Sequence, residues 1–190
     1  TVALTTGASL QGLILNQGVE DMQLLGDDRK LHLLRKSRNR YRPVTSQTDW
    51  PSYNGQTSGS RHSSLAQITK SNVARLAPKW IFGLPNTPPL QVTPVVVDGV
   101  MYVTSANQCF ALDAGSGREI WHYSRPRTKG LIGNAAGGAN RGVGVAGDRV
   151  FMVTDHAHVI ALNRATGALL WETEMADWRQ NYNATVAPLP

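Results

Sequence analysis

The stretch Asp98-Gly-Val-Met-Tyr-Val-Thr104 recurs fifty residues later as Asp148-Arg-Val-Phe-Met-Val-Thr154. The segments that follow also align without a gap: Ala111-Leu-Asp-Ala-Gly-Ser-Gly-Arg-Glu-Ile-Trp121 matches Ala161-Leu-Asn-Arg-Ala-Thr-Gly-Ala-Leu-Leu-Trp171. Self-similarity at a fixed period of this length is the sequence signature of a repeat architecture. These two copies therefore decide the fold.

Each copy predicts one small antiparallel sheet. It contains an alternating β-rich run, a second short strand, a glycine-bearing turn and a third strand that carries the tryptophan. Four-stranded repeats of roughly 40–50 residues are typical of β-propeller blades stacked around a channel. We expect Trp121 and Trp171 to fill the gap between adjacent blades, and the glycine four residues before each to leave room for a backbone. The alternative is that both indoles are core residues of an isolated sandwich.

The predicted blades are too few to close a ring. Residues 77–190 accommodate two blades, and their last ten residues resemble the opening strand of a third, similar to Gln91-Val-Thr-Pro-Val-Val-Val97. Closed propellers have at least four blades. We therefore expect this chain to be a fragment of a longer propeller, with an N-terminus that has been cut.

Two further pieces precede the repeats, and the fold class predicted for the whole is all-β. Residues 1–43 alternate short apolar runs with turns, which suggests a small β-barrel or meander. Residues 44–76 are rich in Ser, Thr, Gln, Asn and Gly and are interpreted as a linker, with one helix predicted over 64–76.

Composition excludes several classes of protein. The 190 residues are 41% hydrophobic, and no apolar run approaches the roughly 20 residues that span a bilayer. The single cysteine, Cys109, excludes an internal disulfide and a multi-cysteine zinc site, and is expected to be a small buried hydrophobe. The net charge is +6. Seven basic residues crowd one segment: Arg29, Lys30, Arg35, Lys36, Arg38, Arg40 and Arg42. A solvated strand face is favoured there, and nucleic-acid binding is the alternative.

Two histidines form the one metal-ligand pattern in the repeats. His156 and His158 stand two apart on a predicted strand, hence on one face, and could bind a metal. Because the sequence indicates no third ligand near them, we favour side chains that line a blade edge near the axis. No glycine-rich phosphate loop follows a strand and opens a helix, so nucleotide binding has no support.

The motifs of residues 48–190 together resemble the N-terminal part of the quinoprotein alcohol dehydrogenases of the methanol and ethanol type, which use pyrroloquinoline quinone (PQQ). The resemblance rests on Trp50-Pro-Ser-Tyr-Asn-Gly55, Leu65-Ala-Gln-Ile-Thr69, Asn72-Val-Ala-Arg-Leu76, Trp80, Val92-Thr-Pro-Val-Val-Val-Asp-Gly-Val-Met-Tyr-Val103, the two tryptophan motifs and Asn140-Arg-Gly142. Residues 1–43 resemble a small barrel module that in some bacterial proteins lies between a cytochrome c and a following domain.

The resemblance implies an eight-bladed ring that holds PQQ and a calcium or lanthanide ion near its axis. It implies a periplasmic oxidoreductase that oxidises a primary alcohol to an aldehyde and passes electrons to a cytochrome c. The metal ligands and the catalytic aspartate of the family would come from segments after Pro190, so this fragment holds no catalytic residue and is expected to be inactive alone. The alternative is a non-catalytic propeller scaffold that binds a partner protein through open blade edges.

Five positions match the cofactor pocket of the family. Arg141 stands where an arginine lies beside the quinone, and Thr185 matches a threonine whose hydroxyl contacts the cofactor. Gln91 replaces a glutamate. Ala135 and Ala136 stand where relatives commonly have adjacent cysteines, so no vicinal disulfide can cover the quinone, and a small-residue lid there would be more mobile. The alternatives are a surface arginine, an ordinary strand threonine and a linker glutamine.

Overall fold

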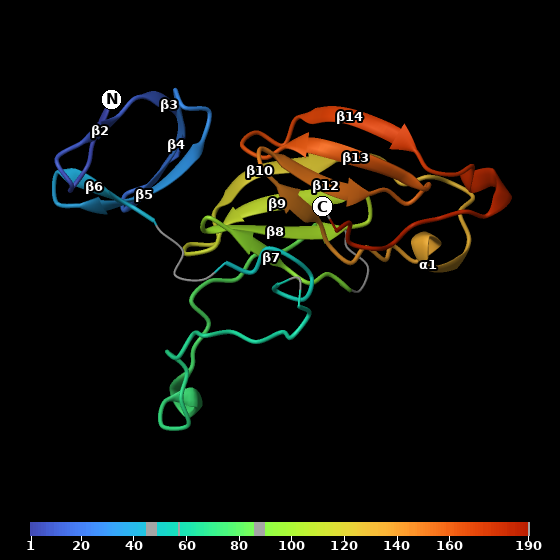
Figure 1. Ribbon diagram of the computed structural model, residues 1–190, viewed down its shortest axis with the longest axis horizontal. Helices are drawn as coiled ribbons and strands as arrows, with labels where there is room; N and C mark the ends of the chain where they lie inside the picture. The colour runs from blue at the N-terminus through green and yellow to red at the C-terminus, as the bar shows by residue number, and fades with distance from the viewer. Residues whose placement is uncertain (45–48, 57, 86–89, 190) are drawn as a thin grey trace.

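The structure, a computed structural model, describes residues 1–44, 49–56, 58–85 and 90–189. Strands dominate it, and they form three four-stranded antiparallel sheets and one two-stranded sheet. Figure 1 shows the N-terminal module at one side and the two repeat sheets next to each other. The all-β prediction is confirmed. Within these residues no helix is both long enough and apolar enough to cross a membrane.

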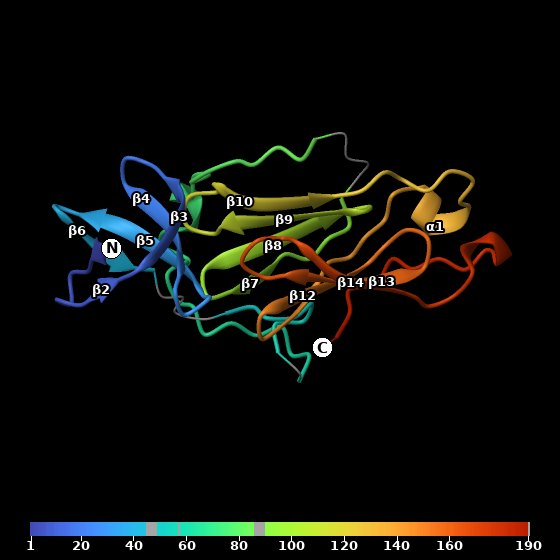
Figure 2. The same ribbon diagram turned by 90° about the horizontal axis from the view of Figure 1, so that it is seen from above.

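The two repeats form two sheets of the same plan. The first contains β7 (Val95–Val97), β8 (Val100–Ser105), β9 (Gln108–Asp113) and β10 (Glu119–Ser124), and the second contains β11 (Gly144–Ala146), β12 (Arg149–Val153), β13 (His158–Asn163) and β14 (Leu169–Glu174). In each sheet every strand pairs with its neighbour in sequence, so the sheet is a simple meander. Buried residues of both sheets, among them Tyr102, Val150 and Ile160, form one hydrophobic cluster. The two sheets therefore pack as neighbouring blades (Figure 2).

The turn after the second long strand of each repeat is built by one side chain. The carboxylate oxygen Oδ1 of Asp113 accepts from the backbone N–H groups of Gly115 and Ser116, at 2.9 and 3.2 Å. The amide oxygen of Asn163 accepts from Ala165 and Thr166 in the same way, at 2.9 and 3.1 Å. Asp and Asn favour such turns because their short side chains reach the backbone two residues on. The Asp/Asn of the repeat is thus a turn residue.

The glycine of each repeat receives an indole from earlier in the chain: Gly167 that of Trp121 in the first repeat, and Gly117 that of Trp80, which precedes the first repeat. Gly117 and Gly167 both have φ near +72°, and a Cβ on either would lie 2.6 Å from the ring of Trp80 or Trp121, respectively. Each indole also donates its N–H to a carbonyl of the same turn, Trp80 to Ala114 at 3.1 Å and Trp121 to Arg164 at 2.9 Å. The indole was expected between blades, and Trp121 lies there. The expectation that the glycine admits a backbone was wrong, because the group that approaches it is an aromatic face.

The N-terminal module is a curled sheet with its own core. Its strands are β1 (Val2–Ala3), β2 (Ser9–Leu10), β3 (Gly12–Gln17), β4 (Asp21–Gly26), β5 (Leu31–Ser37) and β6 (Arg40–Pro43). β3 to β6 form a meander, and a parallel bridge from Leu4 to Tyr41 brings the first strand back to the last. Figure 1 shows the resulting barrel-like ring. Its core consists of Val2, Leu4, Met22, Leu24 and Leu34.

Part of the basic segment serves to hold this module to the first blade. Arg35 pairs with the fully buried Asp113 at 2.5 Å. Arg118 of the first blade reaches back to Asp21 at 3.2 Å. Within the module itself, Arg40 donates to the backbone carbonyl of Leu4 at 3.2 Å. These contacts give part of the charge cluster a structural role within the chain.

The segment between module and blades contains little regular structure. The helix predicted over 64–76 is wrong in extent, because only the 3₁₀ turn η1 (Val73–Arg75) forms. Its apolar residues Leu65, Ile68 and Val73 are exposed, and a helix without a face to bury has little to stabilise it. Residues 45–48 and 57 of the predicted linker lie outside the described residues. The remaining helical pieces are α1 (Gly133–Ala136) and η2 (Trp178–Gln180).

Candidate functional site

Three segments, which contain Thr93, Arg141 and Thr185, meet at Arg141. The backbone N–H of Arg141 donates to the carbonyl of Thr185 at 2.9 Å, and the carbonyl of Arg141 accepts from Thr93 at 3.3 Å. The Arg141 guanidinium also donates through Nη1 to the hydroxyl of Thr185. Two of the predicted site residues, 44 positions apart in sequence, are therefore in direct contact.

Gly142 allows this close approach. Its φ is +127°, and a Cβ at this position would lie 3.1 Å from the carbonyl oxygen of Thr93 and 3.7 Å from Cβ of Ala187. A side chain would push these neighbouring segments apart, and the left-handed backbone also favours glycine. The Asn140-Arg-Gly142 motif thus places the arginine between two neighbouring segments.

The charge of Arg141 is partly withdrawn from water. Its residue is half-buried, whereas Thr185 is 9% exposed. Among the residues that the structure describes, no carboxylate lies within ion-pairing distance of the Arg141 guanidinium. A guanidinium that is partly removed from water and fixed by a hydroxyl is suited to bind a carboxylate or polarise a carbonyl of a ligand.

The other predicted positions lie in different environments. Ala135 is buried in the short helix α1, and Ala136 beside it is exposed. Gln91 is exposed and lies two residues before Thr93, which binds the backbone of Arg141. The structure shows no contact of Gln91 with Arg141 or Thr185.

Arg127 holds the predicted lid segment, and sequence reasoning missed it. Its Nη2 donates to the carbonyls of Ala135 and Ala136, at 2.5 and 3.0 Å, while its Nε donates to Asp155 at 2.8 Å. The same carboxylate accepts from the backbone and the hydroxyl of Thr128, at 3.0 and 2.9 Å. The two-alanine segment is thereby tied to the β12–β13 turn. The sequence signal was weak, since Arg127 is one of several arginines in a loop.

Asp155 is the anchor of this arrangement, which we call the Arg127 clamp: Arg127, Thr128 and Asp155 with the carbonyls of Ala135 and Ala136. Burial alone would raise the pKa of Asp155, but hydrogen bonds, that from Arg127 foremost, outweigh it and hold the pKa below its ordinary value. Its backbone N–H donates to the side chain of Asn107, at the equivalent turn of the first blade, at 2.9 Å. Asp155 therefore remains an anion with its oxygens engaged, which does not suit it to act as a base.

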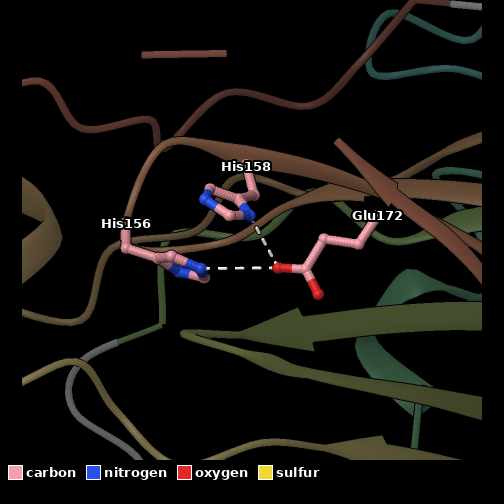
Figure 3. A group of neighbouring side chains, drawn as sticks. All are labelled: His156, His158 and Glu172. Carbon is pink, nitrogen blue, oxygen red and sulfur yellow. Dashed lines mark hydrogen bonds and ion pairs between the residues drawn. The ribbon is translucent and has the colours of Figure 1, made fainter. Parts of the chain in front are cut away.

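A second polar cluster lies at the other side of the same turn (Figure 3). The rings of His156 and His158 lie together, with centroids 4.0 Å apart, but the prediction that both stand on one strand was wrong, because His156 belongs to the turn before β13. The expectation that no third ligand lies near them was wrong: Glu172 of β14 approaches both, 2.7 Å from His158 and 3.4 Å from His156. Arg125 pairs with the same carboxylate at 2.6 Å. Desolvation, together with the charges of His158 and Arg125, lowers the pKa of His156.

Cys109 is fully buried, and burial raises the pKa of its thiol well above the ordinary value. A thiolate is therefore strongly disfavoured. This confirms the expectation of a small buried hydrophobe.

Comparisons with known proteins agree with this architecture. Residues 50–169 match the family model described as glucose/ethanol/alcohol dehydrogenase, beta-propeller domain, of the PQQ type. Among curated relatives, the quinohemoprotein alcohol dehydrogenase ADH IIB of Pseudomonas putida is 37% identical over 142 residues, which cover 74% of this chain and 21% of the relative. The 1-butanol dehydrogenase (cytochrome c) of Thauera butanivorans is 37% identical over 145 residues, or 74% and 21% of the two chains. The chain thus spans about a fifth of the length of these relatives.

Solved structures give the same result. A europium-containing methanol dehydrogenase superposes with a TM-score of 0.67 at 30% identity, over 76% of this chain and 26% of that one. The quinohemoprotein alcohol dehydrogenase from Comamonas testosteroni superposes with a TM-score of 0.64 at 30% identity, over 74% and 22%. Because the family model covers most of the chain and both blades follow its plan, this chain belongs to the PQQ-dependent alcohol dehydrogenase β-propeller family.

Proposed function

We propose that this chain forms part of a periplasmic PQQ-dependent dehydrogenase that oxidises a primary alcohol to an aldehyde and delivers the electrons to a cytochrome c. The observation that carries the proposal is Arg141, a half-buried guanidinium held by Thr185 without a carboxylate partner among the described residues. The names of the relatives support the substrate class and the acceptor, since they include an ethanol dehydrogenase and a cytochrome-linked butanol dehydrogenase.

The residues present fit one edge of a PQQ site. PQQ is a flat tricarboxylate, so its site requires cations, hydrogen-bond donors and a smooth surface. Arg141 would supply the cation, Thr185 a hydroxyl, and the backbone around Ala135 and Ala136 a surface without bulky side chains. Gln91 fits less well, because it is exposed and an amide carries no charge. When bound, PQQ would supply the two-electron acceptor for the alcohol.

Within this chain, the proposed roles are binding and positioning. Thr185 fixes the orientation of the Arg141 side chain, and Gly142 lets the arginine backbone approach its neighbours. The Arg127 clamp takes over part of the restraint that a vicinal disulfide would give, because it binds both carbonyls of the two-alanine segment. A calcium or lanthanide ion would take its ligands from segments downstream of residue 190, and the europium-containing relative makes a lanthanide a reasonable choice.

The first test is a PQQ titration of the full-length gene product, followed by absorbance and by the cofactor-dependent shift in melting temperature. We expect Arg141→Ala to weaken PQQ binding at least tenfold, because a charge-assisted hydrogen bond in a partly desolvated site is lost. Arg149→Ala is the matched control, since Arg149 is exposed and pairs with the neighbouring Asp148. An unchanged titration with Arg141→Ala would remove Arg141 from the site.

The second test is activity. The full-length product reconstituted with PQQ and either calcium or a lanthanide is expected to show dye-linked oxidation of primary alcohols. If the product showed neither activity nor a PQQ-dependent shift in melting temperature, the dehydrogenase hypothesis would be rejected. The non-catalytic propeller scaffold would then be the remaining hypothesis.

A further inference from the structure

We propose that His156, His158 and Glu172 form a binding site for a divalent transition-metal ion such as Zn²⁺, which uses none of the residues proposed for the quinone. The three residues come from separate parts of the second blade: the β12–β13 turn, the start of β13 and the outer strand β14. Figure 3 shows both imidazole rings turned toward the same carboxylate.

The spacing of the donor atoms suits a small ion. One ligand atom from each residue lies within 4.8 Å of the other two. Nε2 of His156 is 3.4 Å from Oε1 of Glu172, and Nδ1 of His158 is 2.7 Å from the same oxygen. Ligands of a tetrahedral zinc ion lie about 2.0–2.1 Å from the metal, hence about 3.3 Å from one another. A small movement of the Glu172 carboxylate away from His158 would bring the 2.7 Å separation to this value, and the 3.4 Å separation from His156 already matches it.

The hydrogen bonds of Thr154 prepare His156 as a ligand. The Thr154 hydroxyl can donate to the carbonyl of His158, at 3.4 Å, and it lies 3.0 Å from Nδ1 of His156. When the hydroxyl donates a hydrogen bond to that carbonyl, its oxygen accepts a hydrogen bond from Nδ1–H of His156. The lone pair of Nε2 then faces a carboxylate oxygen at 3.4 Å, and no proton lies between two acceptors. His156 is 7% exposed, so water compensates little for the unpaired Nε2 lone pair, and a cation bound there would satisfy it.

His158 must change its tautomer before it can coordinate the metal ion. In the absence of metal, Nδ1–H of His158 donates to Glu172, and metal binding moves that proton to Nε2 so that Nδ1 coordinates. The Thr154 hydroxyl beside His156 is an outer partner of the type that orients a metal-ligating histidine and tunes its basicity. Two imidazoles and one carboxylate form the ligand set typical of open zinc sites, with the fourth position left for water, and imidazole disfavours Ca²⁺ and Mg²⁺. The partial exposure of the His158 and Glu172 side chains leaves room for that water.

Arg125 opposes the ion and provides a sharp test. Its guanidinium donates to Oε1 of Glu172 at 2.6 Å, so a positive charge already lies beside the carboxylate. Like charges in close proximity repel each other. Loss of this charge should therefore strengthen metal binding, whereas a purely structural His–Glu–Arg network would gain no affinity for a metal from it.

The experiment is a titration of the untagged 190-residue chain with Zn²⁺ by calorimetry and with Co²⁺ by visible absorption, where four-coordinate Co²⁺ gives an intense d–d band. We expect one ion per chain with micromolar or tighter affinity. His158→Ala and Glu172→Gln should each weaken it at least tenfold, and Arg125→Gln should strengthen it several-fold. His62→Ala is the control, because His62 is an exposed histidine of the linker segment.

Circular dichroism and melting curves establish that each variant is folded, and Glu172→Gln keeps the shape of the side chain on an exposed strand. Absence of stoichiometric binding by the folded wild-type chain would overturn the proposal. The proposal would also be overturned if Glu172→Gln and His158→Ala left the metal affinity unchanged. A metal affinity that is lower in Arg125→Gln than in the wild-type chain would overturn it as well.

Discussion

Trp121 and Trp171 occupy the same position in two copies of one sequence pattern, yet their surroundings differ. Trp121 is 7% exposed, because its indole lies on Gly167 of the next blade and donates to the carbonyl of Arg164. Trp171 is 39% exposed and contacts Phe151 of its own sheet, with ring centroids 6.0 Å apart. The comparison shows that the repeat sequence builds the sheet, whereas burial of its tryptophan depends on a neighbouring blade.

The turns of the two repeats form a second comparison, with a smaller difference. Asp113 and Asn163 bind the same backbone groups of their turns, but only Asp113 also binds an arginine, Arg35 of the N-terminal module. Asp113 and Asn163 therefore share the turn-forming role. The ion pair with Arg35 is specific to Asp113 and comes from the N-terminal module. Three predictions use these differences, from the largest effect to the smallest, and a fourth, with the smallest effect, concerns the Arg127 clamp.

The largest effect is expected from truncation of the two tryptophans. Trp121→Ala should lower the free energy of unfolding by about 3–5 kcal/mol, because it leaves a cavity between the blades. Trp171→Ala should cost less, about 1–2 kcal/mol, since the residue is 39% exposed and its truncation opens onto solvent instead of leaving an enclosed cavity. Urea unfolding monitored by circular dichroism measures both. Equal losses for the two variants would contradict the assignment of Trp121 to the interface.

The next prediction concerns the glycine under that indole. Gly167→Ala should cost about 2–4 kcal/mol, because a Cβ would be strained at positive φ and would also clash with Trp121. Gly147→Ala is the matched control: its φ is also positive, +55°, but no atom lies within 4 Å of the added Cβ. Only the backbone strain of about 1–2 kcal/mol should appear there. If both glycine variants unfold at the same denaturant concentration, the contact of Gly167 with the Trp121 indole does not contribute to stability.

The third prediction tests the ion pair that separates the two turns. Arg35→Ala should destabilise the chain by about 2–3 kcal/mol, since it leaves the buried carboxylate of Asp113 without its cation. Asp113→Asn in the same chain should recover most of this loss, because Asn163 performs the turn role in the second repeat without an arginine. Thermal melts of the single and double variants measure the recovery. A double variant no more stable than Arg35→Ala alone would refute the equivalence of the two turns.

The smallest effect is a pH dependence at the Arg127 clamp. Hydrogen bonds from Arg127 and Thr128 outweigh the effect of burial and lower the pKa of Asp155 in the folded chain. Its contribution to stability is therefore complete above the ordinary carboxyl pKa of about 4 and is lost as pH falls through the lower folded value. We expect the stability difference between the native chain and Asp155→Asn to be largest near pH 7 and to shrink below pH 4. A difference independent of pH would exclude the carboxylate as its source.

Much of the fold could be predicted from the residues. The fifty-residue period gave two antiparallel sheets with matching strands, because alternation and turn residues act within a few positions. The helix over 64–76 failed for the converse reason: capping residues and apolar spacing favour a helix locally, but Leu65, Ile68 and Val73 find no partner surface. Propensity without tertiary packing is too weak to hold a short helix.

The candidate sites show the same division. Arg141 and Thr185 were identified from a family resemblance, and their direct contact across 44 residues emerged only in the structure. Arg127 and Glu172 were missed, because each acts through a partner in another strand or loop, Asp155 and the two histidines. No motif of either residue marks it in the sequence.

The sequence by itself determined the repeating unit: strands, Asp/Asn turns, a glycine at positive φ and one tryptophan per sheet, all set by contacts between residues close in the chain. Only the tertiary structure decided which indole is buried, which arginines carry a partner and which histidines meet a carboxylate. These outcomes depend on groups that are far apart in sequence and come together when sheets pack, and burial and electrostatics there depend on distance in space.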